Sequence, residues 1–460
     1  MGLLGLDLTS WGLVATFIIL LLYFMGSRGH DFFSKRDVPY LRPLPILGNM
    51  GALVFRRKSF GELLESLYIE FKRHKVGGMF RFNQPVYVLC DPETIKQITV
   101  KDFDHFVDRS VPFPEDSEPL FMKSLIGLKG DKWKNMRSTL SPAFTSSKMK
   151  NMFLLVDECG NQLSQYLHDE LKKQGGGTLG LEMKDLFTRY ANDVIATAAF
   201  GIQCDSLKDN SNQFYVMGKE ATISSAAKSL IFLGYLCAPK LMRMMGIPLL
   251  SRPVSKFFKG LIYDTLEVRQ RQNIIRPDMI HLLLQARKAE LKGQDGTTEL
   301  SDEDIAAQAF LFFLAGFDTT STLLCFITYL LALHGGIQDR LQAEIEQVLE
   351  NSGGKTTYED LHAMKYLDQV VSECLRLYPP AVVVDRECLR TYTIPGTHIT
   401  LEKGMRFALM EVKLALVHLL HNFNLQTTSK TPIPLQITRK SLNMMVDGGF
   451  WIGIEPRTKA

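Results

Sequence analysis

One long helix near the middle of the sequence constrains this fold more than any other feature. The segment Asp302–His334 is strongly apolar after its first turn and would extend about 50 Å at 1.5 Å per residue. Ser301 followed by Asp304 is typical of a helix start, and Gly335-Gly336 is typical of a helix end. A helix this apolar is typical of the buried centre of a large helical body.

Helical patterns also fill the region around it, whereas strand patterns are few and short. Residues 141–287 are a succession of amphipathic helical segments with polar breaks. Val76–Phe82 and Val86–Cys90 have strand character, with a turn expected at Asn83-Gln84-Pro85. Met445–Ile452 is typical of a hairpin with an Asp-Gly turn. The predicted fold class is therefore mostly α with minor β, an α+β body whose strands are segregated.

The first residues form an apolar segment. Trp11–Gly26 contains no charged residue, and basic residues follow at Arg28, Lys35 and Arg36. Roughly 20 mostly apolar residues can span a bilayer, and flanking basic residues stay on the cytosolic side. Residues 1–27 are therefore predicted to be a retained membrane anchor. Residues 28–46 are rich in proline and predict a stiff hinge, and residues 47–460 form the body in the cytosol.

Charge and cysteine usage argue against several other classes of protein. The net charge is +4, from 53 basic and 49 acidic residues, without a long block of either sign. Nucleic acid is therefore not an expected partner, because proteins that bind it usually carry a basic stripe. The seven cysteines never form a Cys-x-x-Cys pair, which indicates a reducing compartment and neither a disulfide framework nor a zinc site. They are Cys90, Cys159, Cys204, Cys237, Cys325, Cys374 and Cys388.

One face of the long helix carries a glycine where a bulky side chain would be expected. Gly316 shares this face with Phe312 and Thr319, and Asp318 lies beside them. Glycine inside a helix costs roughly 1 kcal/mol relative to alanine, so its presence predicts that another group approaches closely. The alternative is a buried helix whose Thr and Ser side chains bond back to the preceding turn.

Two further pairs have the spacing of neighbours on one helix face. Glu373 and Arg376 are three residues apart, and Pro379-Pro380 ends their helix. Trp133 and Arg137 are four residues apart and can present an N–H and a guanidinium to a carboxylate. Alternatively, the first pair is an ordinary surface ion pair. In the second, Trp133 would then pack in the core while Arg137 faces solvent.

Taken together, these motifs resemble the cytochrome P450 family of haem-thiolate monooxygenases, and most closely the microsomal detoxifying members of insects. The resemblance runs through Trp133–Arg137, Ala315–Thr320 and Glu373–Arg376 in the family's order, and covers nearly the whole chain. It implies a cytochrome P450-like fold and a haem (heme) cofactor. It also implies an NADPH-dependent reductase as partner, a lipophilic small-molecule substrate, and the endoplasmic reticulum membrane as location.

The resemblance also implies a role for each motif residue. Ala315 and Gly316 would leave room for haem and dioxygen, and Asp318 and Thr319 would deliver protons. The haem propionates would be held by Arg109, Trp133 and Arg137, and Glu373 with Arg376 would form a structural ion pair.

The resemblance breaks at the junction between Gly404 and Met405. A strand-like segment ends there, and the helical pattern Arg406–Phe423 begins at once. In the family several dozen residues lie between these segments, including the Phe-x-x-Gly-x-Arg-x-Cys-x-Gly loop whose cysteine binds iron. The predicted fold is therefore incomplete on the proximal haem side, without a metal ligand. Met405 or His398 could in principle bind iron, but neither would supply a thiolate.

Two consequences and two hypotheses follow. The family's partner for Glu373 and Arg376 lies in the absent segment, so this pair is expected to be buried and incompletely satisfied, at a cost in stability. Under the first hypothesis the chain is a membrane-anchored monooxygenase by family that is impaired or inactive without its cysteine. Under the second it is a catalytically dead, membrane-tethered splice or gene-model variant, at most a binder of family partners.

Overall fold

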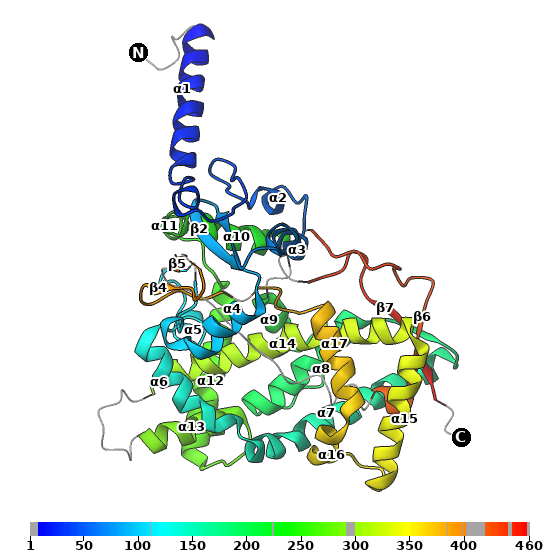
Figure 1. Ribbon diagram of the computed structural model, residues 1–460. Coiled ribbons are helices and arrows are strands. Elements are labelled where there is room, and N and C mark those ends of the chain that lie inside the picture. Colours follow the sequence, from blue (N-terminus) through cyan, green and yellow to red (C-terminus); the bar gives the residue numbers. More distant parts are fainter. Residues whose placement is uncertain are drawn as a thin grey trace. The chain divides into compact units, whose positions relative to one another are not determined.

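A computed structural model describes residues 8–111, 113–222, 225–290, 300–383, 385–397, 399–401, 419–439 and 444–457. The chain divides into two compact units (Figure 1). The first comprises Met1–Ser110 and Val383–Arg406, and the second comprises Val111–Val382 and Phe407–Ala460. The junction at Gly404–Met405, most of the predicted helix after it, and His398 lie outside the described residues.

The first unit contains a β-hairpin and short helices around an aromatic core. Its elements are α1 (Leu8–Ser27), η1 (Ser34–Arg36), α2 (Gly51–Val54), α3 (Phe60–Phe71), β1 (Val76–Arg81), β2 (Gln84–Leu89), α4 (Pro92–Lys96), η2 (Gln97–Lys101), η3 (Phe103–His105), β4 (Tyr392–Thr393) and β5 (Thr400–Leu401). Phe33 and Phe80 are fully buried and lie edge to face, with ring centroids 5.1 Å apart.

The hairpin confirms the two predicted strands but not their turn. β1 and β2 pair antiparallel from Val76–Leu89 to Arg81–Gln84, so the chain turns at Phe82-Asn83. Pro85 was predicted in the turn, yet it is the partner of Phe80 within the strands. Proline is compatible with a strand that needs no N–H at that position, as on an edge.

The second unit is a helical body with α14 (Asp302–Leu333) through its middle and α8 and α12 packed along it (Figure 1). Before α14 come α5 (Pro119–Met122), α6 (Gly130–Leu140), η4 (Ser141–Phe144), α7 (Ser146–Gln174), β3 (Leu179–Glu182), α8 (Met183–Ile195), η5 (Ala196–Phe200), α9 (Gln213–Ala221), α10 (Ala226–Cys237), α11 (Pro239–Met244), α12 (Arg252–Gln272) and α13 (Met279–Glu290). After it come α15 (Gly335–Asn351), α16 (Tyr358–Ala363), α17 (Lys365–Leu377), β6 (Phe423–Thr427) and β7 (Trp451–Pro456).

The two halves of α14 form the centres of two hydrophobic clusters. Residues 305–317 pack with side chains of α9, α12 and α13. Residues 323–331 pack with α7, α8, α15 and α17 and with β6 and β7. By length and hydropathy α14 could cross a membrane, but 72% of its apolar window is buried inside the body. It is the core helix of the second unit, as its apolar sequence predicts.

The start of α14 was predicted correctly, but the glycine pair that predicted its end belongs to the next helix. Ser301 and Asp304 form a capping box, each side chain bonding the other's backbone N–H. The helix ends at Leu333, but Gly335-Gly336 are the first residues of α15 rather than a glycine cap. The chain turns at His334, whose backbone angles are not helical.

A small sheet closes the body, in the order β3-β7-β6. The predicted hairpin in Met445–Ile452 is wrong in its pairing. Before the Asp-Gly turn, the Val446 segment bridges to Ile437, whereas β7 after it pairs with β3 and β6. Gly448 and Gly449 both have positive φ, so the chain turns sharply here. The segments before and after this turn pair with different parts of the chain. Few strands among many helices confirm the predicted fold class, mostly α with minor β.

Candidate functional site

The middle of α14 has an open face. Between Ile305 and Tyr329 every residue is buried or half-buried except Ala315 and Thr319, which are exposed. These two residues are four apart and therefore lie on one side of the helix, a turn apart. Gly316, next to Ala315, is buried. On this side of the core helix only the short side chains of Ala315 and Thr319 face outward, so a flat group can lie against the helix here.

The hydroxyl of Thr319 is bonded back to its own helix. Its Oγ1 donates to the carbonyl oxygen of Ala315, one turn earlier. Ser321 and Thr328 make the same bond, to the carbonyls of Phe317 and Leu324 at 2.9 and 2.8 Å. This back-bonding is the alternative that the sequence also predicts for the hydroxyl side chains of this helix. It does not remove Thr319 from the open face, because its side chain is exposed.

Asp318 is held by a lysine from another helix. Lys184 Nζ, near the start of α8, donates to Asp318 Oδ1 at 2.8 Å. The same ammonium group donates to Ser321 Oγ at 2.8 Å and to Thr322 Oγ1 at 2.7 Å. About a quarter of the Asp318 side chain and a fifth of the Lys184 side chain are exposed, at 27% and 19%. The ion pair is therefore shielded from bulk water and fixes the carboxylate toward α8.

As a result, the two predicted proton carriers point in different directions. Consecutive residues on an α-helix are rotated by about 100° around its axis. Asp318 contacts Lys184 on the α8 side, whereas Thr319 lies on the open side with Ala315. A proton moving between the two would need an intermediate carrier or a change of the Asp318 rotamer.

The predicted propionate-binding residues are divided between the two units. Trp133 and Arg137 lie on α6, four residues apart, with Trp133 buried and Arg137 exposed. Arg109 is half-buried and belongs to the first unit. The structure thus brings Trp133 and Arg137 onto one helix in the second unit.

Glu373 and Arg376 form the predicted ion pair, but not in the predicted environment. Arg376 Nε and Nη2 bind the two carboxylate oxygens of Glu373 at 2.7 Å each, a bidentate pair on α17. The contact with Arg376 lowers the pKa of Glu373. The side chains of Arg376 and Glu373 are 67% and 55% exposed, so the expectation of a buried, incompletely satisfied pair is wrong. An exposed ion pair carries little desolvation cost, so the expected loss of stability does not arise.

Most of the thiols lie in surroundings that favour the protonated form. Burial raises the pKa of most of them, to about 12 for Cys159 and Cys374 and about 11 for Cys204, and to higher than usual values for Cys90, Cys237 and Cys325. Cys388 donates its Sγ–H to the Arg390 carbonyl at 2.8 Å. A thiolate ligand instead needs an environment that lowers its pKa. The protein groups around Cys159, Cys204 and Cys374 therefore do not favour the thiolate form.

Two residues at this helix were not found from the sequence. Lys184 holds Asp318, and Gln308 holds the loop before α6, since its side chain accepts from Leu125 N at 3.0 Å and donates to the Lys123 carbonyl at 2.8 Å. Gln308 is fully buried in the apolar first half of α14. A glutamine in such an apolar segment predicts a specific hydrogen bond, because buried polar groups are hydrogen-bonded. The sequence around Lys184 has no feature that predicts its contact with Asp318.

Comparison with known proteins places these features in one family. The family model described as "Cytochrome P450" matches residues 38–404. "Cytochrome P450 9e2" of Blattella germanica is 48% identical over 526 positions, which cover 98% of this chain and 99% of that protein. "Probable cytochrome P450 9f2" of Drosophila melanogaster is 35% identical over 517 positions, covering 97% and 99%. "Cytochrome P450 6j1" of Blattella germanica is 33% identical over 495 positions, covering 96% and 97%.

Two details of these alignments bear on the junction after Gly404. The family model stops matching at residue 404. The alignment with the 9e2 protein extends over 526 positions although this chain has 460 residues, so several dozen positions of that relative face gaps. With its helical body, its core helix α14 and the motif Ala315–Thr320 on it, the chain belongs to the cytochrome P450 family.

Proposed function

We propose that this chain is a P450-family scaffold that does not carry out the monooxygenase reaction of its family, because it lacks the cysteine that binds haem iron. The family implies a haem cofactor, and its members generally oxidise lipophilic substrates with electrons from an NADPH-dependent reductase. The reaction depends on a thiolate that pushes electron density through the iron and favours O–O cleavage. Without the thiolate, a bound haem would lack this property.

The observation that carries the proposal is the junction itself. No cysteine follows Cys388 in the sequence, and the helical pattern after Met405 directly follows the strand-like segment. The end of the family match at residue 404 and the gapped alignments with relatives support a missing segment at this point. Burial raises the pKa values of Cys159, Cys204 and Cys374, so their protein surroundings do not favour the thiolate form.

The residues on the distal side keep roles of their own in this proposal. Ala315 is exposed on the open face of α14 beside the buried Gly316, and Thr319 lies on the same face. Lys184 holds the Asp318 carboxylate toward α8, away from Thr319. Trp133, Arg137 and Arg109 would hold the propionates of a haem bound there, and the haem would supply the redox chemistry. We further propose Glu373 and Arg376 as a surface-exposed pair that keeps the end of α17 ordered.

We also propose that the chain is held at the endoplasmic reticulum membrane by residues 1–27, with residues 28–46 as hinge and the body in the cytosol. α1 is apolar, and many of its side chains are exposed, such as Leu13 at 73%, Phe17 at 67% and Phe24 at 71%. Exposed apolar side chains along a helix are typical of a segment covered by lipid. Extraction of microsomes with alkaline carbonate tests this, since deletion of residues 1–27 should release the chain.

The decisive measurement is the carbon monoxide difference spectrum of reduced membranes that contain the chain. The matched control carries the corresponding loop of the Blattella 9e2 protein inserted between Gly404 and Met405, and a second control carries the same loop with its cysteine changed to alanine. We expect a thiolate-type Soret band from the first control alone. A thiolate-type band from the chain as it stands would refute the proposal.

The second hypothesis, that the chain is a splice or gene-model variant, is separated from the first by the transcript. Long reads across the codons of Gly404 and Met405 should show this junction in some molecules if the protein is made as written. If every transcript contains an intervening coding segment, the cell makes the complete monooxygenase and this chain does not exist as a protein.

A further inference from the structure

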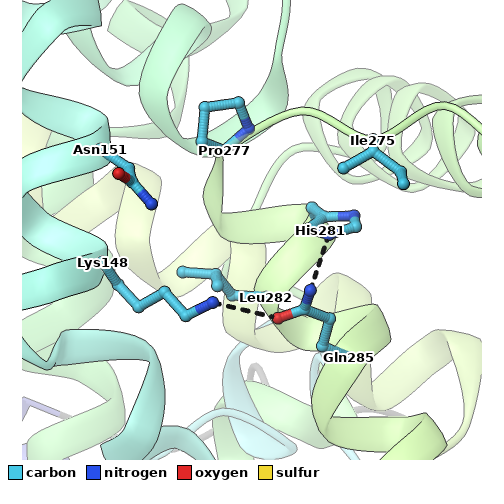
Figure 2. A pocket seen from close by; sticks show the side chains of 7 residues that line it. All are labelled: Lys148, Asn151, Ile275, Pro277, His281, Leu282 and Gln285. Atoms are coloured by element: carbon cyan, nitrogen blue, oxygen red, sulfur yellow. Dashed lines mark hydrogen bonds between the residues drawn. The ribbon is translucent and has the colours of Figure 1, made fainter.

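A small cavity lies between α7 and α13, and its residues are not part of the site on α14. Its volume is about 190 Å³. Figure 2 shows Lys148 and Asn151 reaching it from α7, and His281 and Gln285 from α13 on the other side. The remaining lining residues, Ile275, Pro277 and Leu282, are apolar.

The polar side chains around this cavity are one ammonium group, two amides that both donate and accept, and one imidazole. Lys148 Nζ donates to Gln285 Oε1 at 3.4 Å, a long bond, and Gln285 Nε2 lies 2.9 Å from His281 Nε2 (Figure 2). The amide of Asn151 also faces the cavity (Figure 2). An ammonium group has three donors, so Lys148 can keep this bond and still bind a ligand. None of the described residues that line the cavity is acidic.

The helix geometry adds positive potential at the same place. α7 begins at Ser146 and α13 at Met279, so Lys148 and His281 both lie in the first turn of their helices. The N-terminal turn of a helix carries a partial positive charge and favours anions. At the start of α13 the carboxylate of Asp278 accepts from the backbone N–H of His281 at 3.0 Å and pairs with Arg269 at 2.6 Å, so the positive potential comes from the first turn of α7, which has no side-chain cap.

The apolar side of the cavity indicates what else the ligand carries. Ile275 is 82% exposed at the edge of the cavity, and Leu282 is buried. A cavity of about 190 Å³ is smaller than the roughly 300–1,000 Å³ of typical ligand sites, so it fits a head group rather than a whole ligand. A ligand bound by its head group here would lay its apolar part over Ile275.

We propose that this cavity binds the anionic head group of a small amphiphilic molecule, a phosphate monoester or a carboxylate, with Lys148 as its principal contact and Ile275 against its apolar part. The site is independent of haem binding. It requires neither the axial cysteine nor the residues of the α14 motif.

Isothermal titration calorimetry on the full chain in a non-ionic detergent tests this, with phenyl phosphate, benzoate and inorganic phosphate as probes. Lys148→Gln should weaken the binding of phenyl phosphate about tenfold or more, since a charge-assisted hydrogen bond is lost. Ile275→Ser should weaken phenyl phosphate but leave inorganic phosphate unchanged. A stronger response to benzoate than to phenyl phosphate would identify the head group as a carboxylate.

The matched control is Lys150→Gln, which removes the same charge two positions along α7. Lys150 pairs with Glu359 at 2.6 Å and does not line the cavity, so this variant should bind phenyl phosphate like the unchanged chain. Far-UV circular dichroism should be identical for all variants, because the altered side chains make no buried contact on which folding depends. Equal weakening by Lys148→Gln and Lys150→Gln, or no binding by the unchanged chain at millimolar probe, would overturn the proposal.

Discussion

A buried ion pair joins α12 to the start of α13, and its removal should destabilise the second unit strongly. Arg269 Nη1 and Nη2 bind the two carboxylate oxygens of Asp278 at 2.6 Å each. Their side chains are only 5% and 0% exposed. Arg269 also donates to the Phe200 carbonyl at 3.3 Å, and the backbone N–H of His281 donates to Asp278 at 3.0 Å.

The variant Arg269→Met keeps most of the side-chain volume but leaves the Asp278 carboxylate buried without its bidentate partner. Removing one member of a buried ion pair costs about 3–5 kcal/mol. Arg276 Nε remains 3.6 Å from Asp278 Oδ2 and compensates in part, so we expect a loss near the lower limit, about 3 kcal/mol. Adding Asp278→Asn should recover part of this loss, because the uncompensated charge is then removed.

The assay is urea unfolding followed by far-UV circular dichroism, combined with hydrogen exchange of amides in α12 and α13. Exchange reports local opening even where global unfolding is not two-state. Arg271→Met is the matched control, since Arg271 pairs with Glu267 at 2.6 Å on the same helix but is 77% exposed. Exposed pairs contribute little to stability, so this control should leave the midpoint unchanged. An equal effect of the two variants would refute the reasoning from burial.

Two further predictions concern the same part of the second unit. Gly201→Ala should lower the urea midpoint, because Gly201 has a φ of +71° and an added Cβ would collide with the guanidinium of Arg269; an unchanged midpoint would mean that this contact relaxes easily. Burial raises the pKa of Asp193, so the folded state holds its proton more tightly than the unfolded chain does, and this group adds stability as the pH falls from neutral toward the ordinary carboxyl range. Asp193→Asn, which keeps an acceptor for the N–H of Ser206, should reduce that gain in urea titrations across this pH range; an identical pH profile would contradict it.

Features that depend on a few neighbouring residues were predictable. The start of α14 follows from the exchange of bonds between Ser301 and Asp304, which are three positions apart. The pair Glu373–Arg376 follows from helical spacing in the same way. The end of α14 was less predictable, because Gly335-Gly336 can end one helix or begin the next, and only the packing of α15 decides between them.

By itself, then, the sequence determined the mostly helical class, the core helix and the order of the family motifs. The tertiary structure alone decided that Asp318 pairs with Lys184 and that Ala315 and Thr319 lie open. It also decided that Glu373 and Arg376 are exposed, contrary to expectation. The physical reason is the separation along the chain over which each interaction acts. Helix spacing and capping act over three or four residues, whereas burial and the pairing of distant charges depend on which helices pack together, and no local pattern encodes that.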